Sequence, residues 1–563
     1  MKKQLLNLLM AIFISISFNI SSQERYIDEV FESVDVISDV SYGNNVSVLT
    51  LLFDQPPFVQ DLLMDIYTPS GDTETNRPVV IMLHTGSFLP PVVNGQATGS
   101  KADNAIVAQC ESFAKKGFVA VAISYRSGWN PSSTNPDVRR RGLVQAALRG
   151  LQDTRTAVRF LRKSYLDEGN PYGISCQFAV GGLGTGGYVA LAAAALNDYE
   201  TELTTPKFMD TSQDIDGDGV NDAVPYIIPE FLGNLDGTSE GILPELDLDG
   251  DGITDETDVV LCIPNHVGYS SQIDMAFNIG GAMVDTAWMN QGECPIASMQ
   301  CYLDEDAPYD VGNIVVPVTN EIVIEGHGSL ALQKVAESLG NNDVFNGLSM
   351  NITDSWYGNG DGAANSSIQV QAENMFGSLQ FDENGNPVWE FEGHEVYPGL
   401  FPIVAPTGDE LEPGDDCANC GADATYCLFP WIEQGAPWDW WNNDIDDPFS
   451  YPNLAANTET NPLYDGETTP ATFACLSTNG NPDMSEAKGL AFASMIQEFI
   501  TPRIYVALGL ELNSNVCSIA DNKQKLKLVK QTDLMGRTIN ANEKGIVFKI
   551  YDNGTVQKLF NIK

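Results

Sequence analysis

The sequence predicts an α/β protein with a mostly parallel central sheet and helices on both faces. Residues 78–83 and 118–123 carry this prediction, since each is a continuous apolar run of strand length. Such runs are typical of strands that are buried on both faces of a parallel sheet. Residues 102–116 lie between them and have the pattern of a helix, so the three segments form a strand, helix and strand unit.

The remaining elements follow the same alternation along the chain. The apolar residues Val158, Leu161 and Tyr165 fall near one side of an amphipathic helix that leads to a strand starting near Gln177. Further strands are expected at residues 46–53, 61–67, 273–280 and 295–302, and the last helix of the domain at residues 485–506. Residues 201–271 and 382–480 are too long and too rich in Asp, Asn, Gly and Pro to be simple connections, so we expect two insertions there.

The beginning of the chain has the pattern of a secretory signal peptide. Lys2 and Lys3 precede an apolar run at residues 5–18, which is followed by a polar stretch. The apolar run is short for a membrane span. We therefore expect residues 1–23 to be a signal peptide, residues 24–510 to form the main domain, and the mature protein to have no membrane span.

The end of the chain, residues 518–563, is basic whereas the body is acidic. Its segments 532–537, 545–551 and 556–558 read as short strands that are joined by turns. This region resembles the C-terminal sorting domain of the type IX secretion system, whose members have a D-L-x-G-R turn and end in a G-x-x-x-K strand. The resemblance implies a small C-terminal β domain, the type IX secretion machinery as a partner, and a secreted or cell-surface location.

Charge and cysteine content agree with export. The 76 acidic and 29 basic residues give a formal net charge of −47, which argues against nucleic acid or an anionic membrane as a partner. The chain has ten cysteines, and an even number in an exported protein favours disulfides whose connectivity stays open. The spacing of Cys417, Cys420 and Cys427 also leaves a zinc site as the less favoured alternative.

Residues 178–191 contain the most informative motif. They read as a strand, a turn Gly182-Leu183-Gly184-Thr185-Gly186, and a helix. This segment resembles the nucleophile elbow G-x-S-x-G of α/β hydrolases, in which a serine is exposed on a tight turn between a strand and a helix. The position of that serine is occupied by Gly184, which has no side chain that can attack a substrate.

A second motif follows the strand at residues 79–83. It reads His84-Thr85-Gly86-Ser87-Phe88 and resembles the H-G-G-G-[FW] loop of carboxylesterases and lipases. The residues Ser124-Tyr125-Arg126 and the helix at residues 153–162 are also similar to this family. The resemblance implies the α/β-hydrolase fold, with an oxyanion loop formed by His84, Thr85, Gly86 and the neighbouring Thr185.

The same resemblance implies an acid and a histidine, and only the acid is present where it is expected. The strand at residues 295–302 leads to Asp304, which takes the acid position, with Asp306 as the alternative if the loop is shifted. The histidine should come later, just before the last helix, and none stands there. The histidines are His84, His266, His327 and His394, of which only His394 comes late enough. It would require the second insertion to fold back over the site.

The first insertion contains two calcium-loop patterns. Oxygen ligands at alternating positions, with a glycine at the sixth position, are the spacing that calcium loops use. A solvated acidic loop is the alternative, and no organic cofactor is expected. The candidate ligands are Asp214, Asp216, Asp218, Val220 and Asp222 in the first loop, and Asp247, Asp249, Asp251, Ile253, Asp255 and Asp258 in the second.

These observations predict an exported, carboxylesterase-like protein whose catalytic centre is impaired and whose pocket binds a small-molecule, ester or glycan ligand. One alternative is an active ester hydrolase with a displaced centre, formed by Thr185 or Ser87 with His394 and Asp304. Another is a calcium-stabilised binding or adhesion protein of the cell surface. The tryptophans in the stretch 437–441 are interpreted as packing residues, with sugar stacking as the alternative.

Overall fold

The computed structural model confirms the α/β architecture. Described residues are 24–53, 55–91, 93–94, 98–213, 219–243, 259–301, 304, 306–315, 322–348, 372–373, 378–379, 397–403, 435–441, 485–510, 528–532, 545–551 and 556–561. The expected signal peptide at residues 1–23 therefore lies outside them. None of the described helices is long and apolar enough to cross a membrane.

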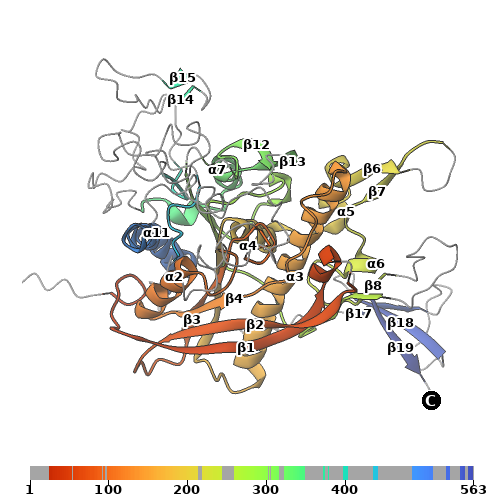
Figure 1. The fold of residues 1–563 in the computed structure, drawn as a ribbon. Coiled ribbons are helices and arrows are strands. Elements are labelled where there is room, and N and C mark those ends of the chain that lie inside the picture. The colour runs from red at the N-terminus through yellow and green to blue at the C-terminus, as the bar shows by residue number, and fades with distance from the viewer. Residues whose placement is uncertain are drawn as a thin grey trace, which may run out of the picture.

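An eight-stranded sheet forms the centre of the protein (Figure 1). Its order is β1-β2-β4-β3-β5-β10-β11-β16. The six strands from β4 to β16 are parallel to one another, whereas β2 pairs antiparallel with both β1 and β4. Their bounds are Val34–Ser47, Phe58–Pro69, Val119–Ile123, Arg77–Leu83, Ile174–Leu183, Met275–Ile279, Ile296–Cys301 and Leu400–Ile403, in the order of the sheet.

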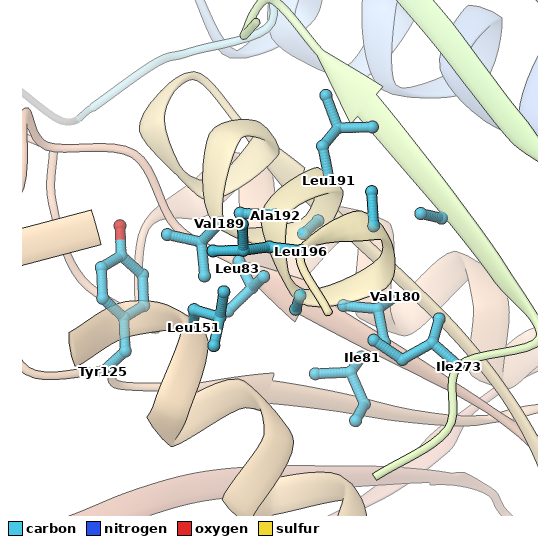
Figure 2. Packing of buried hydrophobic residues seen from close by; sticks show 14 of the residues in the cluster. Ile81, Leu83, Tyr125, Leu151, Val180, Val189, Leu191, Ala192, Leu196 and Ile273 are labelled. Carbon is cyan, nitrogen blue, oxygen red and sulfur yellow. The ribbon is translucent and has the colours of Figure 1, made fainter. Parts of the chain in front are cut away.

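Helices cover both faces of the sheet because its central strands are apolar on both sides. Val80 and Met82 of β3 point into the core beneath α2 (Asn104–Lys115) and α11 (Glu486–Ala507). The alternate residues Ile81 and Leu83 point to the opposite core, beneath α3 (Pro136–Asp167) and α4 (Thr185–Ala195). Figure 2 shows part of this second core, to which Ile81, Leu83 and Val180 of the sheet and Val189 and Leu191 of α4 contribute. The continuous apolar runs in the sequence are therefore explained, as predicted, by burial of these strands on both faces of the sheet.

One local prediction was wrong. Residues 46–53 were expected to form a strand, but β1 ends at Ser47 and a 3-10 helix, η1, covers Leu49–Phe53. The apolar side chains of η1 are not buried, so the segment does not belong to the sheet. The helix expected at residues 153–165 is confirmed as the second half of α3, and the other expected helices and strands of the main domain agree to within two or three residues. In the C-terminal segment a strand was expected at residues 532–537, but β17 covers Leu528–Thr532, and residues 533–537 lie outside the described residues.

Smaller elements surround the sheet. The first insertion contains α5 (Tyr199–Glu202), η2 (Pro206–Phe208), β6 (Met209–Gln213), β7 (Asp222–Pro225), α6 (Pro229–Leu232), β8 (Gly241–Leu243) and β9 (Val259–Cys262). After β10 come η3 (Thr286–Trp288), β12 (Val311–Val315), β13 (Ile322–His327), α7 (Ser329–Leu339), η4 (Asp343–Phe345), β14 (Ala372–Glu373) and β15 (Ser378–Leu379). A separate three-stranded antiparallel sheet ends the chain, with β17 (Leu528–Thr532), β18 (Gly545–Tyr551) and β19 (Val556–Asn561).

The first insertion is attached to the core through buried arginines of α3. Arg159 donates to the carbonyl of Asn265 at 3.2 Å, and Arg162 donates to the carbonyl of Ser270 at 2.8 Å. Both arginines are buried. Their guanidinium groups donate hydrogen bonds to these backbone carbonyls, which water would otherwise have to satisfy. The insertion is therefore part of the folded domain on this side of the sheet.

Candidate functional site

The turn between β5 and α4 has the geometry of a nucleophile elbow. Gly184 links the two elements with φ 51° and ψ −121°, a conformation that is costly for residues with a β-carbon. The flanking glycines are required by close packing. A β-carbon on Gly182 would lie 2.2 Å from the carbonyl carbon of Gly186, and one on Gly186 would lie 2.3 Å from the oxygen of Leu83. The turn is thus preserved at the three glycine positions of the motif.

The space beside Gly184 is occupied by Thr85. A β-carbon added at Gly184 would lie 2.2 Å from Thr85 Oγ1 and 3.1 Å from Thr85 Cβ. Carbon and oxygen atoms that are not bonded do not approach to 2.2 Å, so a side chain at position 184 and the present side chain of Thr85 exclude each other. The sequence indicated a missing nucleophile, but it did not show that another residue fills the same space.

The loop after β3 is held in a defined conformation. Gly86 has a φ of 115°, and Ser87 and Phe88 also have positive φ values, of 54° and 57°. The carbonyl of Ser87 accepts a hydrogen bond from Trp129 Nε1 at 2.7 Å, and the carbonyl of His84 accepts one from the hydroxyl of Tyr125 at 2.8 Å. These bonds stabilise the strained conformation of the loop.

His84 has a structural role in this loop. Its ring stacks on Tyr125 at a centroid distance of 4.4 Å, and Nδ1 lies 2.6 Å from the carbonyl oxygen of Thr85. Burial lowers the pKa of His84 to about 4, so the imidazole is neutral near pH 7. With Nδ1 engaged by the backbone and its ring packed against Tyr125, His84 stabilises the loop.

Asp304 lies at the same edge of the sheet as the elbow. Its Oδ1 accepts hydrogen bonds from the backbone N–H groups of Asp306 and Ala307, both at 2.9 Å. Its Oδ2 lies 3.7 Å from the point where a β-carbon of Gly280 would stand, directly after β10. Burial and the neighbouring carboxylate of Asp306 raise the pKa of Asp304 above its usual range. Of the two expected acids, Asp304 has the fixed position, whereas Asp306 is exposed.

The histidines in the described ranges have partners away from Asp304. His266 Nε2 lies 2.8 Å from the carbonyl oxygen of Tyr42, and His327 Nδ1 lies 2.7 Å from the hydroxyl of Thr286. His327 is the last residue of β13, two positions before α7 begins. His394 lies outside the described residues. In the part of the chain that the structure describes, Asp304 is therefore not paired with an imidazole.

The tryptophan-rich segment packs beside the same site. Trp438 is 1 % exposed, and its ring lies 2.7 Å from the β-carbon position of Gly280. Trp440 is also buried, and its carbonyl accepts a hydrogen bond from Asn104 Nδ2 at 3.2 Å. These contacts favour the packing interpretation. The described residues of this segment contact the beginning of α2 and cover the end of β10, which the sequence did not reveal.

The expected calcium loops lie almost entirely outside the described residues. Val220 and Asp222 are described, with Val220 exposed and Asp222 at the start of β7, and the other candidate ligands are not. Within the described ranges, no group of three or more His, Cys, Asp or Glu residues is arranged to hold a metal ion. The calcium loops and the cluster of Cys417, Cys420 and Cys427 therefore stay predictions.

The prediction of disulfides from the even number of cysteines does not apply to three of them. Cys110, Cys262 and Cys294 are free thiols. Cys110 lies in α2 beneath the sheet and Cys262 ends β9, and both are buried. Buried thiols behave as small apolar side chains, so packing accounts for these positions. Burial also raises the pKa of the Cys294 thiol to about 12, which keeps it protonated.

Comparisons with known proteins agree with the geometry of the site. Residues 64–227, which include β3, the loop that follows it, α3 and the turn before α4, match the model of the esterase family BD-FAE. No curated protein matches the sequence.

Three solved structures illustrate the similarity. Thermogutta terrifontis esterase 2 phosphorylated by paraoxon is 17% identical over 50% of this chain and 74% of that chain, with a TM-score of 0.27. The apo form of that esterase is 17% identical over 44% and 70%, with a TM-score of 0.25. A bifunctional GH43-CE protein of Bacteroides eggerthii is 13% identical over 54% of this chain and 31% of that chain, with a TM-score of 0.29. The strand order of the central sheet is consistent with the α/β-hydrolase fold, and the matched segment at residues 64–227 supports an esterase-like domain within it.

Proposed function

We propose that this protein is a ligand-binding relative of esterases that has lost ester hydrolysis. The observation that carries the proposal is Gly184, which has the backbone conformation of an elbow nucleophile but no side chain, and whose side-chain space is taken by Thr85. Covalent ester hydrolysis needs a nucleophile and a base that removes its proton. The elbow supplies no nucleophile, and the three described histidines are bonded elsewhere.

The direction of β16 also argues against His394 as the base. Leu400 of β16 is level with Ser298 of the parallel strand β11, so the chain enters β16 at the amino-terminal edge of the sheet. Gly184 and Asp304 lie beyond the opposite edge, where β5 and β11 end. Two residues lie between His394 and the described Tyr397, and three steps of fully extended chain span at most about 11 Å.

The preserved parts of the site favour reversible binding. The loop after β3, the elbow turn and Asp304 keep their positions, although the reaction they served cannot proceed through Gly184. Thr85, Gly184, Thr185 and Asp304 are each partly exposed, so they form an accessible surface at the carboxyl edge of the sheet. This edge is where open α/β sheets bind ligands, and we propose a small ester or glycan as the ligand.

Labelling of the purified protein with a fluorophosphonate tests the loss of catalysis. We expect no more labelling of the wild type than of heat-denatured protein, and no turnover of a panel of short-chain esters. The Thr185→Ala and Ser87→Ala variants serve as controls, since each removes an alternative nucleophile. Labelling of the wild type that disappears in either variant, or in His394→Ala, would show an active hydrolase with a displaced centre instead.

We further propose that the protein is exported by the type IX secretion machinery and acts outside the cell or on its surface. The signal-peptide pattern at residues 1–23 and the basic C-terminal segment support this proposal. The described strands β17, β18 and β19 fall in the segment where short strands were expected. Deletion of residues 518–563 should leave the protein inside the cell envelope, and normal export of the truncated protein would contradict the proposal.

A further inference from the structure

Thr85 and Gly184 come together because their strands are neighbours. Strands β3 and β5 are parallel, with Leu83 level with Gly182. Thr85 and Gly184 each follow two residues later, so both stand just beyond the carboxyl ends of adjacent strands. The elbow and the loop after β3 are thus brought together by the sheet register.

We propose that Thr85 closes the former nucleophile position, and that Thr85 and Gly184 form an interdependent pair. The inference rests on the proposed function, because it explains how the elbow is stabilised without a nucleophile. Thr85 Oγ1 stands 2.2 Å from the place of a β-carbon at position 184. The hydroxyl therefore fills the volume that a serine side chain at this position would need.

Side-chain rotation relieves this conflict only in part. Turning Thr85 about χ1 moves Oγ1 away, but Thr85 Cβ stays 3.1 Å from the same point, which is tighter than an ordinary contact. A β-branched side chain also has few allowed rotamers. A residue larger than glycine at position 184 therefore requires the side chain of Thr85 to rotate and its β-carbon to shift.

A double-mutant cycle tests this dependence directly. The four proteins are the wild type, Gly184→Ala, Thr85→Gly and the double variant, and their equilibrium constants of unfolding are measured in urea. We expect Gly184→Ala to increase the equilibrium constant of unfolding strongly in the wild-type background. In the Thr85→Gly background, the factor by which Gly184→Ala increases this constant should be at least about tenfold smaller. Such a difference lies within the range of coupling between residues in contact.

A control separates the contact from the cost of the backbone conformation. Gly169 also has a positive φ, of 76°, but a β-carbon there would meet no atom within 4 Å. Gly169→Ala should therefore have the same cost in both backgrounds, because it measures only the conformational cost of adding a β-carbon.

The outcomes divide clearly. An equal cost of Gly184→Ala in both backgrounds overturns the assignment of Thr85. If Gly184→Ala does not fold, folding of the double variant supports the assignment, and failure of both variants to fold overturns it. This result is independent of the fluorophosphonate assay, in which labelling of the wild type would contradict the proposed function without affecting the coupling.

Discussion

At the scale of single residues, the protein keeps strained positions next to an altered site. Gly184, Ser87 and Phe88 all have positive φ values within two neighbouring turns. Strain of this kind persists when surrounding contacts fix the conformation, and it is common at active sites. Gly182 and Gly186 meet the close packing of this turn, and Gly184 has no side chain there.

Buried ionisable residues make stability depend on pH, and Asp103 shows this most clearly. It lies at the beginning of α2 and accepts hydrogen bonds from the N–H groups of Gly99 and Ser100 at 2.8 and 3.0 Å. Burial raises the pKa of Asp103 to about 7. The folded protein therefore binds a proton that the unfolded chain releases at about pH 4, so this contribution to stability is lost as pH rises from about 4 to 7.

The Asp103→Asn variant should remove this dependence. An amide is neutral at every pH, so the difference in free energy of unfolding between variant and wild type should change between pH 4 and 8. One pKa unit corresponds to about 1.4 kcal/mol, which limits the change to the order of 4 kcal/mol. Urea titrations at several pH values measure it. A difference that is constant with pH would mean that Asp103 is ionised in the folded protein.

At the scale of elements, the contact between β4 and α3 depends on one buried ion pair. Arg126, directly after β4, donates from Nε to Asp153 of α3 at 2.9 Å, and both side chains are fully buried. The backbone N–H of Arg126 also donates to this carboxylate at 2.8 Å. The guanidinium further contacts the carbonyl of Leu261 at 3.4 Å, so the pair connects the sheet, the long helix and the first insertion.

Removal of Asp153 should therefore be strongly destabilising. We expect Asp153→Ala to lower the free energy of unfolding by about 3–5 kcal/mol, because it leaves a buried guanidinium without its counter-charge. The matched control is Asp310→Ala, which breaks the exposed pair with Lys334, where the side chains are 46 % and 44 % exposed. Exposed pairs contribute at most about 1 kcal/mol. Equal losses in the two variants would contradict the role of burial.

At the scale of the whole molecule, the net charge of −47 is the dominant property. Self-repulsion at this charge opposes a compact state, and bound cations reduce it. The two repeated acidic loops are where the sequence concentrates carboxylates at calcium-ligand spacing, with Asp216 and Asp249 at equivalent positions. If these loops bind calcium, we therefore expect the bound ions to increase the stability of the entire domain.

Calcium should stabilise the protein against heat and protease. After bound metal has been removed with a chelator, we expect added calcium to raise the melting temperature. A concentration of about 1 mM is suitable, because calcium sites of extracellular modules have dissociation constants of roughly that order. Magnesium at the same concentration is the control, since it demands a smaller octahedral site. Asp216→Asn and Asp249→Asn together should abolish most of the shift. An unchanged melting temperature in the wild type would show that the loops are merely solvated acidic segments.

The sequence by itself determined much of the architecture. Apolar runs such as residues 78–83 predicted buried parallel strands. A strand that is buried on both faces has no alternation of polar and apolar residues. The glycine spacing at positions 182, 184 and 186 predicted the elbow, and the motif after β3 predicted the adjoining loop. The strand prediction at residues 46–53 was wrong, since apolar composition alone does not distinguish a strand from an exposed 3-10 helix.

Only the tertiary structure decided what stands beside Gly184. Thr85 is 99 positions away in the sequence, and nothing local to either residue shows that the register of β3 and β5 brings them together. The entry of the chain into β16 at the edge opposite the elbow was equally invisible from the order of residues. Sequence patterns report the local periodicity of burial, whereas occupancy of a site depends on which strands are paired and in which register. The glycine at position 184 can thus be read from the sequence, whereas the position of Thr85 beside it is a property of the fold.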